Sequence, residues 1–172
     1  GCEIDLRVSD FRELEQNFSG RFDCVASTGN SLPYVENDQV LGVLEQMDAL
    51  VSPGGWLCFD LRNWDKILRT RQRFYTYPPF FRDDIRINLV QAWDYCPDGS
   101  MDFNLLYTFE RDNRIVQRAE FREHYHPISQ KLLLDKLSVM GYQKVELYQN
   151  PAQAGAFTED TDWYCVIAQK PG

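Results

Sequence analysis

Two short apolar runs, at residues 22–27 and 56–59, flank a segment whose apolar residues recur at helical spacing. The apolar positions of that segment are Val40, Leu44, Met47 and Val51. Their steps of four, three and four place them on one face of a helix, and short apolar runs are typical of buried strands in a parallel sheet. The order strand, helix, strand predicts a βαβ unit with two adjacent parallel strands and a right-handed crossover.

Particular residues mark where the elements of this unit begin and end. Asn37 or Asp38 can cap the helix, and the sequence Pro-Gly-Gly at residues 53–55 ends it before the second strand. Upstream, apolar residues alternate with charged ones over residues 4–8, which predicts a half-exposed strand.

The middle of the chain has a different pattern. Three long strands with alternating apolar residues are predicted here, at residues 85–95, 101–110 and 115–123. Turn residues at 97–99 and 112–113 separate them and suit hairpins. We therefore expect a three-stranded antiparallel insertion over about residues 73–124.

The last third returns to mixed structure. Ser129 caps a helix, and Gly141 closes it. The apolar face of this helix consists of Leu133, Leu137 and Met140. Two short strands follow, at residues 145–148 and 164–168. The fold class is therefore α/β, with a mixed, mostly parallel sheet and an antiparallel insertion, and the 172 residues fit one domain.

In open α/β sheets, ligands bind outside the carboxyl ends of the parallel strands. Two polar stretches follow the predicted strands of the βαβ unit, and they offer Asn30, Ser31, Asp60, Arg62 and Asn63. An exposed loop would have much the same composition. The sequence therefore leaves both a ligand site and a solvated loop open at this edge.

Charge and cysteine usage narrow the function class. Eighteen basic and 26 acidic residues give a net charge of −8, which repels polyanions and argues against nucleic-acid binding. No apolar run reaches the length of a membrane span. The five cysteines, Cys2, Cys24, Cys58, Cys96 and Cys165, form no Cys-x-x-Cys pair and indicate a reducing, cytoplasmic compartment.

Two histidines, His124 and His126, share one face of a predicted strand. Two ligands are too few for a zinc site, which needs three or four, and no cysteine or histidine at a suitable spacing supplies the rest. We therefore expect no metal in this protein.

Four stretches in this order, at residues 8–11, 22–31, 52–55 and 60–68, resemble class I S-adenosylmethionine (SAM)-dependent methyltransferases. The last stretch, together with Gly29-Asn30-Ser31, is similar more narrowly to the glycine/sarcosine N-methyltransferase group. His124-Tyr125-His126-Pro127 and the closing residues 163–168 fit the same family. The resemblance implies the C-terminal part of a Rossmann-like fold, with SAM as cofactor.

On the cofactor side, the resemblance implies four residues. Asp10 would accept a hydrogen bond from the adenine amino group, and Phe11 would pack on the adenine ring. Thr28 and Gly29 would approach the methionyl part through backbone groups. For Asp10 the alternative is a helix cap, a common role for Asp before a residue such as Glu13.

On the acceptor side, the resemblance implies that Asn30 faces a small amine or amino acid. Arg62 would hold the carboxylate of that substrate, because a guanidinium fork matches a carboxylate bidentately. The alternative for Arg62 is a structural ion pair with Asp60 or Asp65.

Tyrosines would shape the amine pocket. Tyr75, Tyr77 and Tyr125 are the positions that the resemblance implies, and which of Tyr75 and Tyr77 matches is open. Ordinary aromatic packing is the alternative for each of them. Displacement at a sulfonium methyl by a neutral amine requires neither a metal nor a covalent intermediate. No residue of the sequence is assigned as a general base.

The chain departs from the family at one point. The family carries an acidic-x-Gly-x-Gly loop that cradles the methionine, and none of the ten glycines here forms that pattern. We therefore expect an N-terminally truncated methyltransferase domain, whose missing part belongs to the same protein or to a partner chain, with little SAM affinity on its own. The alternative is a catalytically silent binding or assembly domain with the same fold. A homo-oligomer is compatible with the sequence.

Overall fold

The computed structural model describes residues 3–150 and 153–172, so the predicted thiol Cys2 lies outside the described residues. These residues form two compact units. Unit 1 comprises the chain up to Lys66 and from Ile128 onward, and unit 2 comprises Ile67–Pro127.

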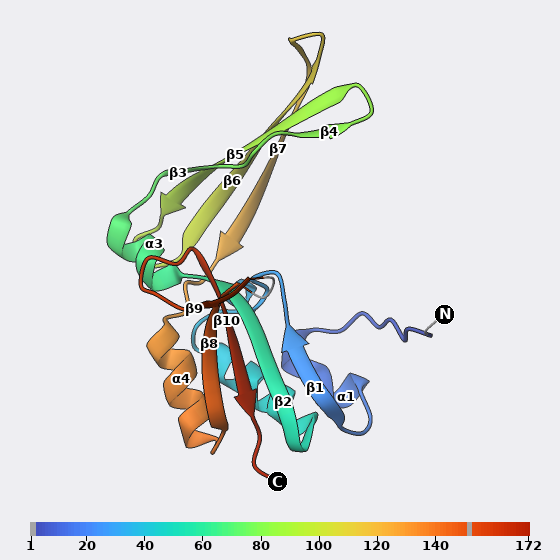
Figure 1. The fold of residues 1–172 in the computed structure, drawn as a ribbon, viewed down its shortest axis with the longest axis vertical. Helices are drawn as coiled ribbons and strands as arrows, with labels where there is room; N and C mark the ends of the chain where they lie inside the picture. The colour runs from blue at the N-terminus through green and yellow to red at the C-terminus, as the bar shows by residue number, and fades with distance from the viewer. Residues whose placement is uncertain (1–2, 151–152) are drawn as a thin grey trace. The chain divides into compact units, whose positions relative to one another are not determined.

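Unit 1 is a five-stranded sheet with helices (Figure 1). Its helices are η1 (Phe11–Glu13), α1 (Leu14–Asn17), η2 (Leu32–Tyr34), α2 (Val40–Ala49) and α4 (Gln130–Val139), and α3 (Trp64–Thr70) begins in it. Its strands are β1 (Phe22–Ser27), β2 (Val51–Arg62), β8 (Gln143–Asn150), β9 (Gln153–Ala156) and β10 (Trp163–Gln169).

The predicted βαβ unit is confirmed. Strands β1 and β2 pair in parallel, with Ser27 opposite Phe59, and α2 connects them. The sheet order is β1-β2-β10-β8-β9, and the pairs after β1–β2 are antiparallel. The sheet is therefore mixed, as expected, but the expectation of a mostly parallel sheet is wrong for these residues. The twelve positions between β8 and β10 also hold β9, which leaves too few for the helical crossover that parallel neighbours need.

The Pro-Gly-Gly turn does not separate α2 from the next strand as predicted, because it lies inside β2. The register of β1 against β2 shifts at this point, which marks a bulge. A Cβ on Gly55 would lie 2.9 Å from the backbone oxygen of Ser52 and 3.0 Å from that of Asp23. Only glycine fits there without a backbone shift.

Two expectations for the start of unit 1 are wrong. Residues 4–8 form no strand, and Ile4, Leu6 and Val8 are exposed. Strand β1 forms where predicted but is mostly exposed rather than buried, with Phe22 43% accessible. β1 is the last strand at its edge of the described sheet, so no described strand pairs with its other side.

The two longer helices pack into one core. Apolar side chains of α2, β2, α4 and β10 form a single buried cluster. Ser129 caps α4 as predicted, since its Oγ accepts from the Leu132 N–H at 3.2 Å. The predicted caps Asn37 and Asp38 are wrong for α2. The Gln39 and Val40 N–H groups donate to the backbone oxygen of Glu36 instead, so a backbone turn starts this helix.

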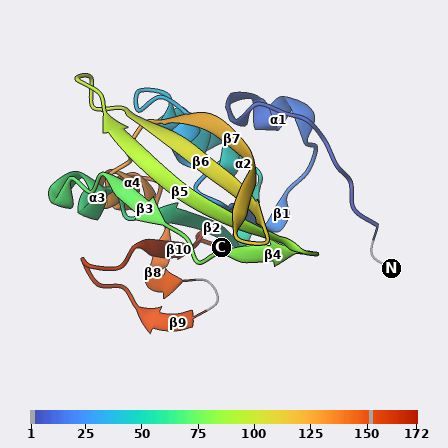
Figure 2. The same cartoon turned by 90° about the horizontal axis from the view of Figure 1, so that it is seen from above.

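Unit 2 is an antiparallel sheet, seen from above in Figure 2. Its strands are β3 (Phe74–Thr76), β4 (Phe80–Arg82), β5 (Ile85–Tyr95), β6 (Met101–Arg111) and β7 (Arg114–Tyr125). The three long strands are confirmed, and β3 and β4 are short additions that both pair with β5. Asp112 and Asn113 have φ values of 50° and 59°, which a tight hairpin turn requires at both central positions.

Strand register gives the sheet of unit 2 two different faces. The aromatic face carries Tyr75, Leu89, Trp93, Phe103, Tyr107, Phe121 and Tyr125. The charged face carries Arg86, Asn88, Asp94, Asp102, Asn104, Glu110, Arg122 and His124. Alternation along each strand produces this separation, because successive side chains point to opposite faces.

Candidate functional site

The carboxyl ends of β1 and β2 lie side by side, and the loop after β1 folds back onto β2. Gly29 and Asn30 both have positive φ, 72° and 58°. The Asn30 N–H donates to Oδ1 of Asp60 at 3.1 Å and to its backbone oxygen at 3.3 Å. The structure therefore brings together the two polar stretches that the sequence placed at this edge.

The side chain of Asn30 is fixed by two donors. Its Oδ1 accepts from the Arg62 backbone N–H at 3.0 Å and from Nε1 of Trp64 at 3.1 Å. Both groups can only donate, so the Asn30 amide atom that faces them must be the oxygen, and Nδ2 points away from them. Asn30 is 2% exposed, and its Nδ2 has no hydrogen-bond partner in the described part of the chain.

Ser27, the last residue of β1, repeats this feature. It is 5% exposed, and its Oγ likewise has no partner among the described residues. Buried polar groups in native proteins are nearly always hydrogen-bonded, and leaving one unpaired costs about 1–3 kcal/mol. Two such groups within four residues mark the end of β1 as a place where a ligand or water is expected.

Arg62 is also buried, at 5% exposed. Its guanidinium carbon lies 4.9 Å from the ring centroid of Trp163 on β10. The two carboxylates considered as its ion-pair partners each accept from a backbone group: Asp60 from Asn30, and Asp65 from the Gln130 N–H at 2.9 Å. The role of Arg62 as a substrate anchor stays a prediction.

Asn63 ties a distant loop to the same edge. Its Nδ2 donates to the backbone oxygens of Glu159 at 3.1 Å and Thr161 at 2.9 Å. Its Oδ1 accepts from the Lys66 N–H at 3.1 Å, which caps the start of α3. The loop before β10 is therefore held next to the end of β2.

The predicted cofactor residue Asp10 has the role that the sequence offered as its alternative. It caps η1 by accepting from the Arg12 N–H at 2.9 Å, and it forms an ion pair with the Arg12 guanidinium at 2.6 Å. The hydrogen bond from the Arg12 side chain lowers the pKa of Asp10 to about 2. A contact with adenine stays a prediction.

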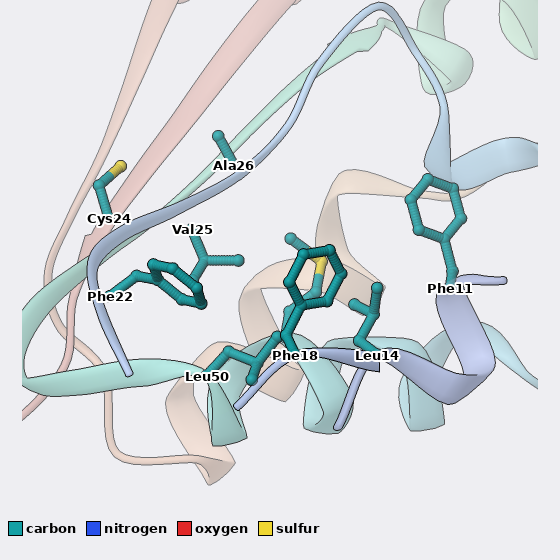
Figure 3. Close-up of a pocket in the computed structure, with 9 residues that line it drawn as sticks. Phe11, Leu14, Phe18, Phe22, Cys24, Val25, Ala26 and Leu50 are labelled. Carbon is teal, nitrogen blue, oxygen red and sulfur yellow. The ribbon is translucent and has the colours of Figure 1, made fainter. Parts of the chain in front are cut away.

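Phe11 lines an apolar pocket beside β1 (Figure 3). The other lining residues are Leu14, Phe18, Phe22, Cys24, Val25, Ala26, Met47 and Leu50, around a volume of about 230 Å³. These side chains offer hydrocarbon and sulfur but no oxygen or nitrogen, so the pocket suits an apolar group. Sequence reasoning missed it, although Phe11, Leu14 and Phe18 recur at helical spacing.

The other predicted cofactor residues lie in the loop after β1. The backbone oxygen of Thr28 accepts from Ser31 Oγ at 2.6 Å. A Cβ on Gly29 would meet nothing closer than Ser31 Oγ at 4.0 Å, so its φ rather than crowding favours glycine. Backbone contacts of Thr28 and Gly29 with a methionyl group remain predictions.

Unit 2 gathers the three predicted tyrosines in one aromatic row. Ring centroids are 5.0 Å apart for Tyr77–Tyr75, 5.7 Å for Tyr75–Trp93, 4.6 Å for Trp93–Phe103 and 4.8 Å for Phe103–Tyr125. Trp93 and Phe103 are each 1% exposed. Neither Trp93 nor Phe103 was predicted as a site residue, although their place on the tyrosine face follows from strand alternation.

The charged face of unit 2 holds a second polar cluster. Asp102, 7% exposed, binds the Arg122 guanidinium, Nδ1 of His124 at 2.8 Å and the Cys96 thiol at 3.6 Å. The hydrogen bond from Arg122, followed by that from His124, lowers the pKa of Asp102 to about 2. The His126 ring lies 4.9 Å from that of His124. No group of three metal-ligating side chains occurs in residues 3–150 and 153–172.

No protein-family model and no curated protein matches the chain. Solved structures do match. A SAM-dependent methyltransferase from Clostridium acetobutylicum has 12% identity and a TM-score of 0.72, over 99% of this chain and 66% of that one. The CcbJ methyltransferase from Streptomyces caelestis has 15% identity and a TM-score of 0.73, over 96% of this chain and 63% of that one.

A third structure is SAM-bound CalS10, an amino pentose methyltransferase from Micromonospora echinaspora. It has 9% identity and a TM-score of 0.69, over 94% of this chain and 63% of that one. The likeness shows that the chain has the Rossmann-like methyltransferase fold. The chain spans 63–66% of the length of these three proteins. Within the described residues, no helix has the length and apolar character to cross a membrane.

Proposed function

We propose that these residues form the acceptor side and part of the cofactor side of a cytoplasmic SAM-dependent methyltransferase that transfers a methyl group to the nitrogen of a small amine. Glycine and sarcosine are the first acceptors to consider. The fold supports the reaction class, and the sequence of residues 29–31 and 60–68 supports the acceptor.

One observation carries the proposal: Ser27 Oγ and Asn30 Nδ2 are buried without a partner at the carboxyl end of the only parallel strand pair among the described residues. Ligands of open α/β sheets bind at this edge. An amide N–H can donate to the carboxylate of an amino acid or of the methionyl part of SAM, and a hydroxyl can donate to that carboxylate or accept from the ammonium group. The polar groups of this edge therefore fit the cofactor and acceptor that the fold implies.

When bound, SAM supplies an electrophilic methyl group on a sulfonium. The task of this chain is to orient the acceptor, which can lower a barrier by about 7–11 kcal/mol when reacting groups are held in line. Asn30 and Arg62 would bind the acceptor, and the hydroxyls of the tyrosine row would orient its amine. The side chains need not transfer a proton before the displacement, because the attacking amine is neutral.

The methionine-cradling loop is the part of the site that these residues do not supply. No acidic-x-Gly-x-Gly pattern occurs in the 172 residues. The proposal assigns that loop to a further segment of the protein or to a partner chain. These 172 residues alone should bind SAM weakly, and a calorimetric titration that gave micromolar affinity for them would contradict this part of the proposal.

Methyl transfer by the protein, in the length that its gene encodes, tests the proposal. Methyl-labelled SAM is offered with glycine, sarcosine and an amino pentose, and label should appear on at least one of them. No transfer to any acceptor, with no thermal shift by SAM, would overturn the proposal in favour of the catalytically silent domain.

Two serine variants locate the site in the same assay. Ser27→Ala should reduce kcat/KM by about tenfold, the effect of one lost hydrogen bond of about 1.4 kcal/mol. It should not lower the melting temperature, since the removed hydroxyl has no partner among the described residues. Ser138→Ala, at an exposed serine of α4, is the matched control. Equal activity of both variants would show that the ligand does not reach the end of β1.

A further inference from the structure

Several polar groups on the charged face of unit 2 pair with one another. Arg86 pairs with Glu110, and Asn88 donates to Thr108 Oγ1 at 2.9 Å. Asn104 donates to Asp94 Oδ2 at 2.9 Å. Further along this face, Asp102 binds Arg122 and His124. This face is suited to water, since it carries many charged and polar side chains.

The aromatic face is different at the end of the sheet that carries the β6–β7 turn. Its side chains there are Phe80, Ile87, Leu89, Tyr107, Phe109 and Phe121. Phe121 is 58% exposed and Phe80 is 51% exposed. The Tyr107 ring lies 5.8 Å from Phe121 and 6.4 Å from Phe109. Ile87 is buried and the other three side chains are partly exposed, so the exposed rings of Phe80 and Phe121 dominate this patch. Exposed large apolar side chains gathered on one sheet face mark an interaction surface.

Net charge is divided unevenly between the two units. Unit 2 has nine basic and nine acidic residues, so the whole net charge of −8 belongs to unit 1. Two copies of the chain that approach through unit 1 repel each other. Two copies that approach through unit 2 bring together surfaces without net charge. Self-association through unit 2 therefore carries no net electrostatic penalty.

We infer that this part of the aromatic face packs against the same face of a second copy of the chain, in a symmetric homodimer. A symmetric contact brings the same patch of both subunits together, and an apolar strand surface is complementary to itself. Sheets pack face to face in this manner, with side chains of both inner faces interdigitating. Neutral charge favours this partner over a strongly charged protein.

The size of the patch sets the strength of the contact. The six residues of the patch, on four strands, cover on the order of 200 Å², because each side chain on one face occupies two rises of about 3.4 Å by one strand spacing of about 4.8 Å. Stable complexes bury about 800 Å² on each partner. The homodimer should therefore be weak, with a dissociation constant on the order of micromolar or above.

Sedimentation equilibrium of the protein from about 1 to about 200 µM tests the inference. The wild type should shift from monomer towards dimer across this range. Phe121→Lys should weaken the dimer by at least tenfold, since it places two like charges in the contact. Phe81→Lys is the matched control, because Phe81 is 69% exposed and lies on the charged face of the same sheet, opposite Arg86.

The outcomes separate the inference from its rivals. If Phe121→Lys does not fold, Phe80→Lys on the same aromatic face replaces it. A wild type that is monomeric at every concentration overturns the inference, and so does equal weakening by Phe81→Lys. A dimer insensitive to Phe121→Lys and Phe80→Lys but lost in Phe22→Lys would place the contact at the open edge of β1 and refute the proposed face. A dimer lost only with the aromatic-face variants supports it.

Discussion

Replacing Asn30 with Ala should destabilise the protein strongly, although the residue carries no charge. The substitution leaves two buried donors, the Arg62 N–H and the Trp64 indole N–H, without their acceptor. Each unpaired donor costs about 1–3 kcal/mol. Alanine at φ 58° adds about 1–2 kcal/mol, because its Cβ crowds the following carbonyl in the left-handed region. The free energy of unfolding should fall by about 3–8 kcal/mol.

Asn30→Gly separates the two contributions. Glycine adopts positive φ freely, so this variant loses the acceptor but gains no strain. It should be about 1–2 kcal/mol more stable than Asn30→Ala. Urea unfolding of wild type and both variants, followed by tryptophan fluorescence, measures the differences. A loss below about 1 kcal/mol in Asn30→Ala would mean that the Asn30 side chain does not hold the two strand ends together.

Three further outcomes are expected. Arg62→Lys should lower kcat/KM for a carboxylate-bearing acceptor by about ten- to a hundredfold with SAM affinity nearly intact, because lysine keeps the charge but loses the planar fork. Steady-state kinetics at saturating SAM measure this effect. Unchanged kinetics would make Arg62 a structural ion-pair residue. Gly55→Ala should lower the melting temperature by several degrees, since its Cβ would lie 2.9 Å from the Ser52 oxygen, whereas an unchanged melting temperature would show that the bulge relaxes. Asp102 has a folded-state pKa lowered from 3.8 to about 2, so its ionised form stabilises the protein above about pH 4 and this contribution disappears as pH falls towards 2. Asp102→Asn should therefore reduce the difference in the free energy of unfolding between pH 5 and pH 2. A difference equal to that of the wild type would contradict the stabilisation of ionised Asp102 by Arg122.

Much of the fold could be predicted from local patterns. The alternation at residues 85–95 and the paired positive-φ residues at 112–113 define strands and turns within a few neighbours, and the structure has them where expected. Strand burial was not predictable in this manner. Residues 4–8 alternate like a strand, but a strand requires a partner, and none of the described strands pairs with them.

The candidate site was predictable only in part. Asn30 and Arg62 follow apolar strands, so their place at the sheet edge could be read from the order of elements. The contacts of Trp64 with Asn30 and of Trp163 with Arg62 could not be predicted, because they depend on how side chains from different segments meet in the folded protein. The unpartnered Ser27 hydroxyl is also invisible in the sequence, since burial without a partner is a property of the assembled neighbourhood.

The free edge of β1 has a practical consequence for any preparation that contains these 172 residues alone. Unpaired backbone groups along an edge strand, beside the exposed ring of Phe22, are a template for intermolecular strand pairing. Preparations should lose material to precipitation faster than linearly with concentration, and near the isoelectric point of about 4.7 the mutual repulsion that slows this loss disappears. Storage at neutral pH, modest concentration and low salt follows from the geometry of that single strand.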